Sequence, residues 1–166
     1  MLLLISDANI LMDVEVGDLV ASMFSLGYQF AVPDVLYYEE LEAQHAHLLD
    51  IGLQIRTLSA ENVGRVQVMS QTYPRPGRND LFALVLAQVE NCPLLTGDAA
   101  LRQAAEMEKV EVRGTVWLML EMVRKRRITV AAARAALHKM RANGRRLPWN
   151  AAEQALTVLE ATPPME

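Results

Sequence analysis

The chain begins with a run of apolar residues that ends at a polar pair. Leu2 to Ile5 are all aliphatic, without alternation of polar and apolar positions, and Ser6 and Asp7 follow. A short run of this kind is typical of a strand buried on both faces, as in a parallel sheet covered by helices. From Ile10 the apolar positions recur at helical spacing. This stretch therefore predicts a buried strand that leads directly into a helix, with Asp7 at the junction.

Short apolar runs and helical patterns then alternate along the rest of the chain. Further strands are predicted at residues 29–32, 53–58, 93–96 and 110–112. The predicted helices cover residues 10–26, 34–50 and 59–71, a segment from 79 or 80 through the apolar run 81–87, a segment from 98 to 107, one ending at 124–127, and residues 130–142 and 149–160. Because residues 81–87 are apolar nearly all round, we expect that helix at the centre of the fold.

This alternation predicts an α/β protein with a parallel sheet of four to five strands flanked by helices, a three-layer sandwich. Helical patterns alone follow residue 128. We therefore expect an α/β domain over residues 1–128 and a C-terminal helical extension over residues 129–166 that packs on the same domain.

Composition narrows the class of protein. The chain has 166 residues, 52% of them hydrophobic, which fits one globular domain with a core. Its single cysteine, Cys92, excludes an internal disulfide, so we expect a cytoplasmic protein. No apolar run approaches the ~20 residues of a membrane span, and the N-terminus lacks the basic segment of a signal peptide. Gly97 stands alone, which disfavours a dinucleotide-binding enzyme.

The net charge of −4 hides an uneven distribution. Residues 1–101 hold four basic residues against thirteen acids, whereas residues 102–150 hold twelve basic residues against four acids. This asymmetry hints at an acidic site beside a basic surface that could bind a polyanion. The alternative is ordinary solvation of helix surfaces.

Four acids fall where an α/β sheet places its ligands. Asp7 and Asp98 follow the first and fourth predicted strands, Asp80 begins the apolar helix, and Glu40 lies on the helix after the second strand. Strand ends of a parallel sheet open on one rim, so these acids can face one cleft. Each could instead be a helix cap or a solvated acid. Clustered carboxylates repel unless a cation neutralises them, and oxygen ligands select Mg²⁺ or Mn²⁺.

The settings of these acids resemble the PIN domain, the nuclease fold of VapC-type toxins. The resemblance rests on ISDANILMD at the start, Glu40 before Leu41, Asp80 before an Ala-rich apolar helix, and LLTGDAALRQAA around Asp98, and covers about residues 2–128. Residues 112–128 (VRGTVWLMLEMVRKRRI) and the next helix are similar to a PIN-related bacterial group of unknown function with extra C-terminal helices. Members of that group often have Glu where this chain has Asp80, which instead follows the toxin pattern.

The resemblance implies a Mg²⁺- or Mn²⁺-dependent ribonuclease, the toxin of a toxin–antitoxin pair. Asp7, Asp80 and Asp98 would hold one or two cations, and Glu40 would be a ligand or a base. Glu39 is the alternative to Glu40, which is preferred because it precedes an aliphatic residue. Asn9 and Thr96 could orient a carboxylate or a water, although both also suit purely structural roles. RNA as substrate, an antitoxin protein as partner, and a homodimer are implied in the same way.

Basic residues could contact the RNA. Arg102 lies one helical turn after Asp98 and could reach a phosphate, or could simply pair with Asp98. A cluster at the end of a helix, Arg124, Lys125, Arg126 and Arg127, could bind RNA, and could extend over Arg141, Arg145 and Arg146. Cations at a helix end also complement the helix dipole without any such function.

Two other functions remain as alternatives. A PIN-like module could bind RNA or a protein without cleaving it. A phosphatase-type hydrolase would need a second Asp two residues after the first, and that position is Asn9.

Overall fold

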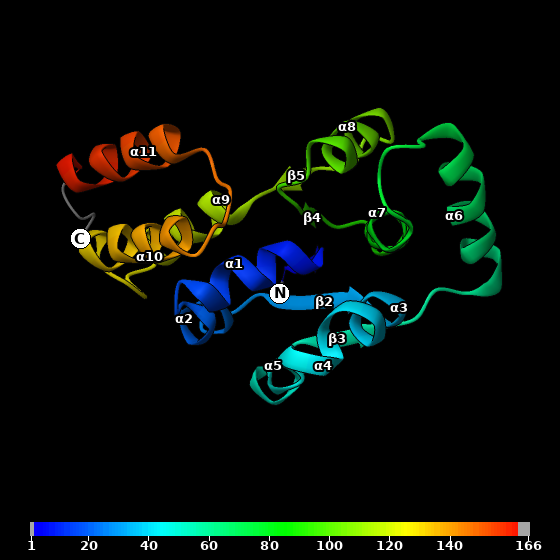
Figure 1. Cartoon of the computed structure of the whole chain (residues 1–166), viewed down its shortest axis with the longest axis horizontal. Helices are drawn as coiled ribbons and strands as arrows, with labels where there is room; N and C mark the ends of the chain where they lie inside the picture. The colour runs from blue at the N-terminus through cyan, green and yellow to red at the C-terminus, as the bar shows by residue number, and fades with distance from the viewer. Residues whose placement is uncertain (1, 163–166) are drawn as a thin grey trace.

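A computed structural model describes residues 2–162 and shows a five-stranded, fully parallel sheet with the order β3-β2-β1-β4-β5 (Figure 1). The strands are β1 (Leu3–Ser6), β2 (Gln29–Pro33), β3 (Gln54–Arg56), β4 (Leu94–Leu95) and β5 (Val112–Arg113). The prediction of an α/β fold with a parallel sheet of four to five strands is confirmed.

Helices connect the strands and continue after the last one. They are α1 (Ala8–Val16), α2 (Val20–Phe24), α3 (Asp34–Leu36), the π-helix η1 (Tyr37–Leu41), α4 (Glu42–His45), α5 (His47–Ile51), α6 (Ala60–Thr72), α7 (Arg78–Glu90), α8 (Ala99–Met107), α9 (Thr115–Arg124), α10 (Val130–Ala142) and α11 (Trp149–Ala161). Figure 1 shows α9, α10 and α11 gathered at one end of the molecule and α6 at the other. No helix within residues 2–162 is long and apolar enough to cross a bilayer.

The sheet contains a topological switch between β1 and β4. From β1 the chain winds outward through β2 and β3, and it then returns to the other side of β1 to form β4 and β5. β1 pairs through Ile5 with Ala31 of β2 and through Ser6 with Leu95 of β4. Open α/β sheets bind ligands in the crevice at the carboxyl ends of the strands beside such a switch. In this protein that crevice lies where Asp7 follows β1 and where Thr96 follows β4.

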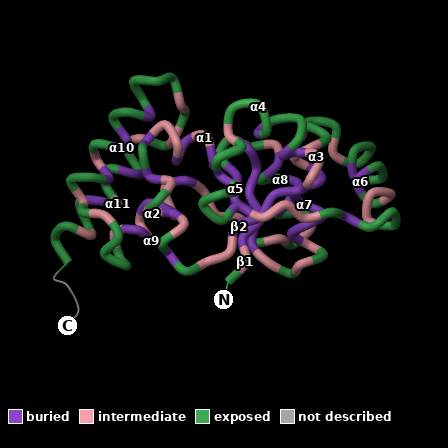
Figure 2. Tube along the Cα trace, turned by 90° about the horizontal axis from the view of Figure 1, so that it is seen from below, coloured by how far each residue is buried: buried purple, intermediate pink, exposed green. Residues whose placement is uncertain are grey.

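Helix α7 is the central helix of the fold, as its apolar pattern predicts. All residues from Leu81 to Ala87 are buried, and α7 packs against β1, β2 and β4. Figure 2 shows the buried segments concentrated around the strands and α7, and on one side of the C-terminal helices. The amino end of α7, which carries Asp80, is therefore held firmly beside the sheet.

Two helices that the sequence predicts as continuous are broken. The prediction for residues 10–26 is wrong because α1 ends at Val16, and Asp18 adopts a left-handed conformation with φ 57° before α2 begins. Helical residues extend from Asp34 to Ile51, which confirms the extent predicted for residues 34–50, but a π turn interrupts the α-helix between Tyr37 and Leu41, both of which are buried, and Ala46 separates α4 from α5. A π turn adds a residue to the helix and is frequent at functional sites. The turn carries Glu39 and Glu40.

The boundaries of the other elements agree with the prediction to within a few residues. The strands are shorter than predicted, most clearly β3 and β4. The C-terminal extension forms α10 and α11, and these helices pack on α1 and α9. Residues 163–166 of the predicted extension lie outside the described part of the chain.

Candidate metal and nucleic-acid site

Asp7 is the buried centre of the site. It is the N-cap of α1, so its Oδ1 accepts a hydrogen bond from the Ile10 N–H (2.9 Å), while its Oδ2 accepts one from the Thr96 hydroxyl (2.6 Å). Only 1% of the residue is exposed. Burial, together with the negative charges of Asp80 and Asp13, raises the pKa of Asp7 from 3.8 to about 6, although the hydrogen bonds from Thr96 and Ile10 lower it. Asp7 is therefore both the N-cap of α1 and a buried acid of the candidate site.

Thr96 links Asp7 to Asp98. The Thr96 hydroxyl donates to Asp7 and accepts a hydrogen bond from the Asp98 N–H (3.1 Å). Asp98 is the N-cap of α8, and its Oδ2 accepts from the Leu101 N–H (2.8 Å). Thr96 is fully buried, whereas Asp98 is exposed. One hydroxyl thus connects the carboxyl end of β4 to both acids.

Asp80 faces the same acids from α7. The reading of Asp80 as a helix cap is wrong, because Gly77 is the N-cap and Asp80 is the third residue of the helix. Burial raises the pKa of Asp80 from 3.8 to about 6, with contributions from the charges of Asp98 and Glu40 and an opposing hydrogen bond from the Gly77 backbone. Asp80 therefore lies close enough to Asp98 and Glu40 for the charges of these acids to act on its carboxyl group.

Glu39 and Glu40 are both fixed by Asn79. The Asn79 side-chain amide donates to Glu39 Oε2 (2.9 Å) and to Glu40 Oε2 (3.1 Å), while Asn79 Oδ1 is buried without a partner among the described residues. Glu39 also lies 3.6 Å from Arg78. A cavity of about 190 Å³ is lined by these residues together with Gly77 and Asp80. Both glutamates therefore belong to the site.

The three aspartates of the site lack a basic partner. Within residues 2–162, Asp7, Asp80 and Asp98 form no ion pair with Lys, Arg or His. Their oxygen-only chemistry fits a hard divalent cation. No three His, Cys, Asp or Glu side chains of the described residues converge closely enough to hold a metal ion. Coordination would require these side chains to turn toward a common point.

Asp13 and Arg145 adjoin the site, and the sequence did not single out this pair. Asp13 is 7% exposed; its Oδ2 accepts from the Thr115 hydroxyl (2.8 Å) and its Oδ1 from Arg145 Nε (2.6 Å). Arg145 Nη2 also donates to the backbone and side-chain oxygens of Asn9 (3.3 and 3.2 Å). An acid among the apolar residues of α1 is the only sequence signal for Asp13.

The basic residues named from the sequence lie in two places. Arg102 forms no ion pair with Asp98 within the described chain, and its guanidinium lies beside Gly114, next to the carboxyl end of β5. In the other cluster, Lys125 lies 4.2 Å from the centre of the Tyr28 ring. Tyr28 precedes β2, so residues 124–127 lie at the amino ends of the strands, across the sheet from Asp7. Their role in RNA binding stays a prediction.

Comparison with solved structures finds similar folds at low sequence identity, and two of them are described here. One is a PilT N-terminus domain protein from the hyperthermophilic archaeon Sulfolobus solfataricus P2, with 14% identity over 74% of this chain and 94% of the other, and a TM-score of 0.49. The second is VapBC2 from Rickettsia felis, bound to a DNA fragment from its promoter, with 18% identity over 68% and 98% of the chains and a TM-score of 0.47. Scores at this level carry no argument about function.

The family comparison is decisive because it covers nearly the whole chain. No curated protein matches the sequence. The family model DUF3368, described as a PIN domain, matches residues 3–161, which include both the α/β domain and the C-terminal helices. The chain therefore belongs to the PIN-domain family.

Proposed function

We propose that this protein is a Mg²⁺- or Mn²⁺-dependent ribonuclease that hydrolyses phosphodiester bonds in single-stranded RNA. One observation carries the proposal: three aspartates near the switch point of the sheet, Asp7, Asp80 and Asp98, form no ion pair with a basic side chain within residues 2–162. Burying unpaired negative charge costs stability. Unpaired acids at this position are what we expect of a site that binds a cation and a phosphate group.

Each residue of the site has a role in this proposal. Asp7, Asp80 and Asp98 would hold the cation, which supplies Lewis-acid activation of the attacking water and neutralises charge on the phosphate. Thr96 keeps Asp7 turned toward the crevice by its hydrogen bond. Asn79 occupies Glu40 Oε2, so Glu40 Oε1 would accept the proton of the attacking water.

The test is cleavage of a labelled single-stranded RNA with and without Mn²⁺. Asp80→Asn keeps the size of the side chain and removes a ligand charge, and should lower kcat/KM at least about a hundredfold. Asp50→Asn is the matched control, because Asp50 is exposed on α5, and it should cleave like the wild type. Equal activity in Asp80→Asn and the wild type, or cleavage that persists in EDTA, would refute the proposed site.

A second candidate is a PIN-like module that binds RNA or a protein without cleaving it. The observation that favours it is that no three acids of the described residues converge at metal-ligand spacing. This function predicts wild-type protein that binds RNA and does not cleave it at millimolar Mg²⁺ or Mn²⁺.

The biological setting follows from the resemblance to VapC-type toxins. A toxin role, an antitoxin partner, a homodimer and a cytoplasmic location are all part of this proposal, and they rest on that resemblance.

A further inference from the structure

The loop between α10 and α11, residues 143–148, borders the acidic site. A cleft of about 290 Å³ contains residues from three distant parts of the chain. Its lining residues are Asn9, Asp13, Gly97, Asp98, Gly144, Arg145 and Arg146. The C-terminal helices thus bring two arginines to the same cleft as an acid of the proposed cation site.

The end of α10 fixes the path of this loop. Gly144 has φ +79°, a left-handed conformation that favours glycine. The Gly144 N–H donates to Arg141 O (3.2 Å) and the Arg145 N–H donates to Met140 O (2.9 Å). This pair of hydrogen bonds is the Schellman motif, which ends a helix and reverses the chain. The reversal directs Arg145 back onto α1.

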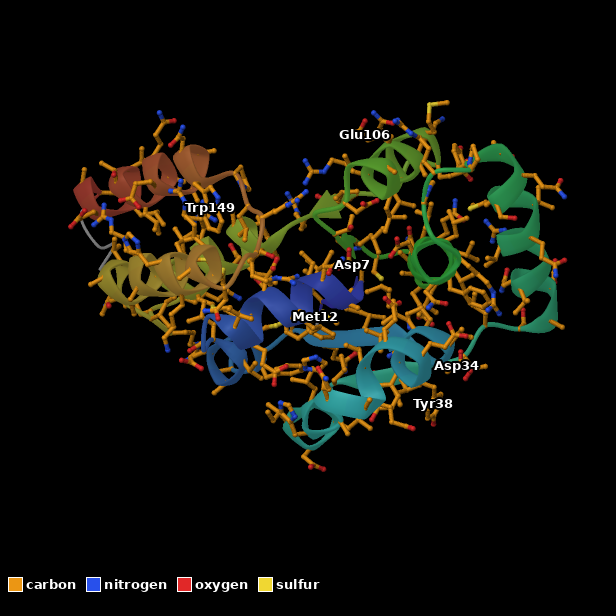
Figure 3. The ribbon with its side chains drawn as sticks, in the orientation of Figure 1. Asp7, Met12, Asp34, Tyr38, Glu106 and Trp149 are labelled. Atoms are coloured by element: carbon orange, nitrogen blue, oxygen red, sulfur yellow. The ribbon has the colours of Figure 1, made fainter. Side chains whose placement is uncertain are left out.

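The residues of the loop alternate between inward and outward positions. Arg145, Leu147 and Trp149 are partly buried, and the last two pack against the core. Figure 3 shows Trp149 at the beginning of α11, in the group of C-terminal helices. Arg146 lies between the anchored residues and is exposed. Within residues 2–162, Arg146 forms no ion pair and no side-chain hydrogen bond.

Hydrogen bonds hold the Arg145 side chain in place, and its guanidinium group still has an unused N–H donor within the described residues. Its Nε and Nη2 are used by Asp13 and Asn9, while Nη1 makes no hydrogen bond within the described residues. An arginine presents several N–H donors in one plane, so a side chain fixed through one edge can bind a phosphate through another. Ordering the guanidinium in advance also reduces the entropy lost on binding.

We propose that Arg145 and Arg146 bind a backbone phosphate of the RNA strand beside Asp98, so that the C-terminal helices form one wall of the substrate site. This inference rests on the proposed ribonuclease function. The acids repel the strand, and a neighbouring phosphate therefore needs a cation that the acids do not neutralise. Arg146 is such a cation, and Arg145 is paired only with Asp13. Residues 124–127, across the sheet, do not line this cleft.

The experiment measures RNA affinity with cleavage blocked. Single-stranded RNA is titrated against the Asp80→Asn protein with Mg²⁺ at several salt concentrations, and then against the same protein with Arg146→Ala, Arg146→Lys or Arg65→Ala added. Arg65→Ala is the matched control, since Arg65 is also an exposed arginine but lies on α6 and does not line this cleft. Loss of one phosphate contact should reduce the slope of log K against log salt by roughly 0.7. Arg146→Ala should weaken binding about five- to tenfold, whereas Arg146→Lys should keep most of the affinity and Arg65→Ala should keep all of it.

The outcomes separate this inference from the proposed function. Unchanged affinity in Arg146→Ala, or an equal loss in Arg65→Ala, would overturn the phosphate site while wild-type cleavage stands. Wild-type protein that neither binds nor cleaves RNA would overturn both. In steady-state cleavage, Arg146→Ala in the wild-type background should raise KM and leave kcat unchanged. A melting curve of this variant that matches the wild type excludes misfolding.

Discussion

Asp7 shows how one residue serves both the fold and the proposed chemistry. Its side chain caps α1 and contacts Thr96, which is 89 residues away in the chain. The sequence predicted that Asp7 and Asp98 open on the same rim, because both follow strands of a parallel sheet. It also named Thr96 as an orienting residue. The direct contact between Asp7 and Thr96 depends on the pairing of β1 with β4, which is a property of the folded sheet.

The raised pKa of Asp7 predicts a dependence of stability on pH in metal-free protein. The unfolded state releases this proton near pH 4 and the folded state near pH 6. Folding is therefore favoured by the bound proton at low pH, and stability falls as the pH rises from about 4 to about 6. Above that range the buried charge costs up to about 3 kcal/mol.

Asp7→Asn removes this charge and keeps an oxygen that can accept a hydrogen bond. In metal-free buffer it should raise the free energy of unfolding by about 2 kcal/mol at pH 8, and the gain should shrink toward pH 5. Urea unfolding at the two pH values measures the difference, with Asp50→Asn as the control that should show neither effect. A destabilised Asp7→Asn protein at pH 8 would contradict the account.

The contact between Asp13 and Arg145 could not be predicted from the sequence. The two residues are 132 positions apart, and neither lies in a motif that points to the other. Their contact needs α10 to pack on α1 and the chain to reverse after α10. Nothing in the local pattern around Asp13 contains that information.

At the scale of elements, hydrophobic periodicity predicted the type of most helices and strands but not where long helices break. The pattern of residues 10–26 is apolar on both sides of Gly17, so this pattern does not reveal the left-handed Asp18 that separates α1 from α2. The π turn that carries Glu39 and Glu40 is similarly hidden, because it shifts the helical phase by a single residue. Periodicity averages over such local changes.

The glycine that ends α10 provides a test of how the C-terminal loop is built. A side chain at Gly144 meets no neighbouring atom within 4 Å, so only its positive φ opposes substitution. Gly144→Ala should lower the free energy of unfolding by about 1 kcal/mol. The control is Gly64→Ala in α6, where the space is also open and φ is not positive, and which should stabilise the protein by up to about 1 kcal/mol. Urea denaturation that shows Gly144→Ala to be neutral or stabilising would refute the role of this turn.

The arrangement of the whole molecule brings acids from four segments of the chain to one region of the sheet. Strand order β3-β2-β1-β4-β5 makes β1 the centre, so the residues after β1 and β4 share the crevice of the switch point. The buried helix α7 brings Asp80 to it, and the π turn after β2 brings Glu40. The sequence predicted the parallel sheet, which the structure confirms, and it predicted that these acids face one cleft, which stays a prediction. It did not predict that the C-terminal helices would border the same cleft. The pattern of apolar residues shows which face of a helix is buried, but not which other element packs against that face.

The central claim is that the acids at the switch point form a site for a divalent cation. The most direct measurement is thermal unfolding at pH 7.5 with increasing Mn²⁺, for the wild type, Asp80→Asn and Asp50→Asn. A cation that binds only the folded state raises its stability by mass action. The account predicts a Tm that rises with Mn²⁺ in the wild type and in Asp50→Asn, and that stays constant in Asp80→Asn. A constant Tm in the wild type at millimolar Mn²⁺, or an equal rise in Asp80→Asn, would contradict it.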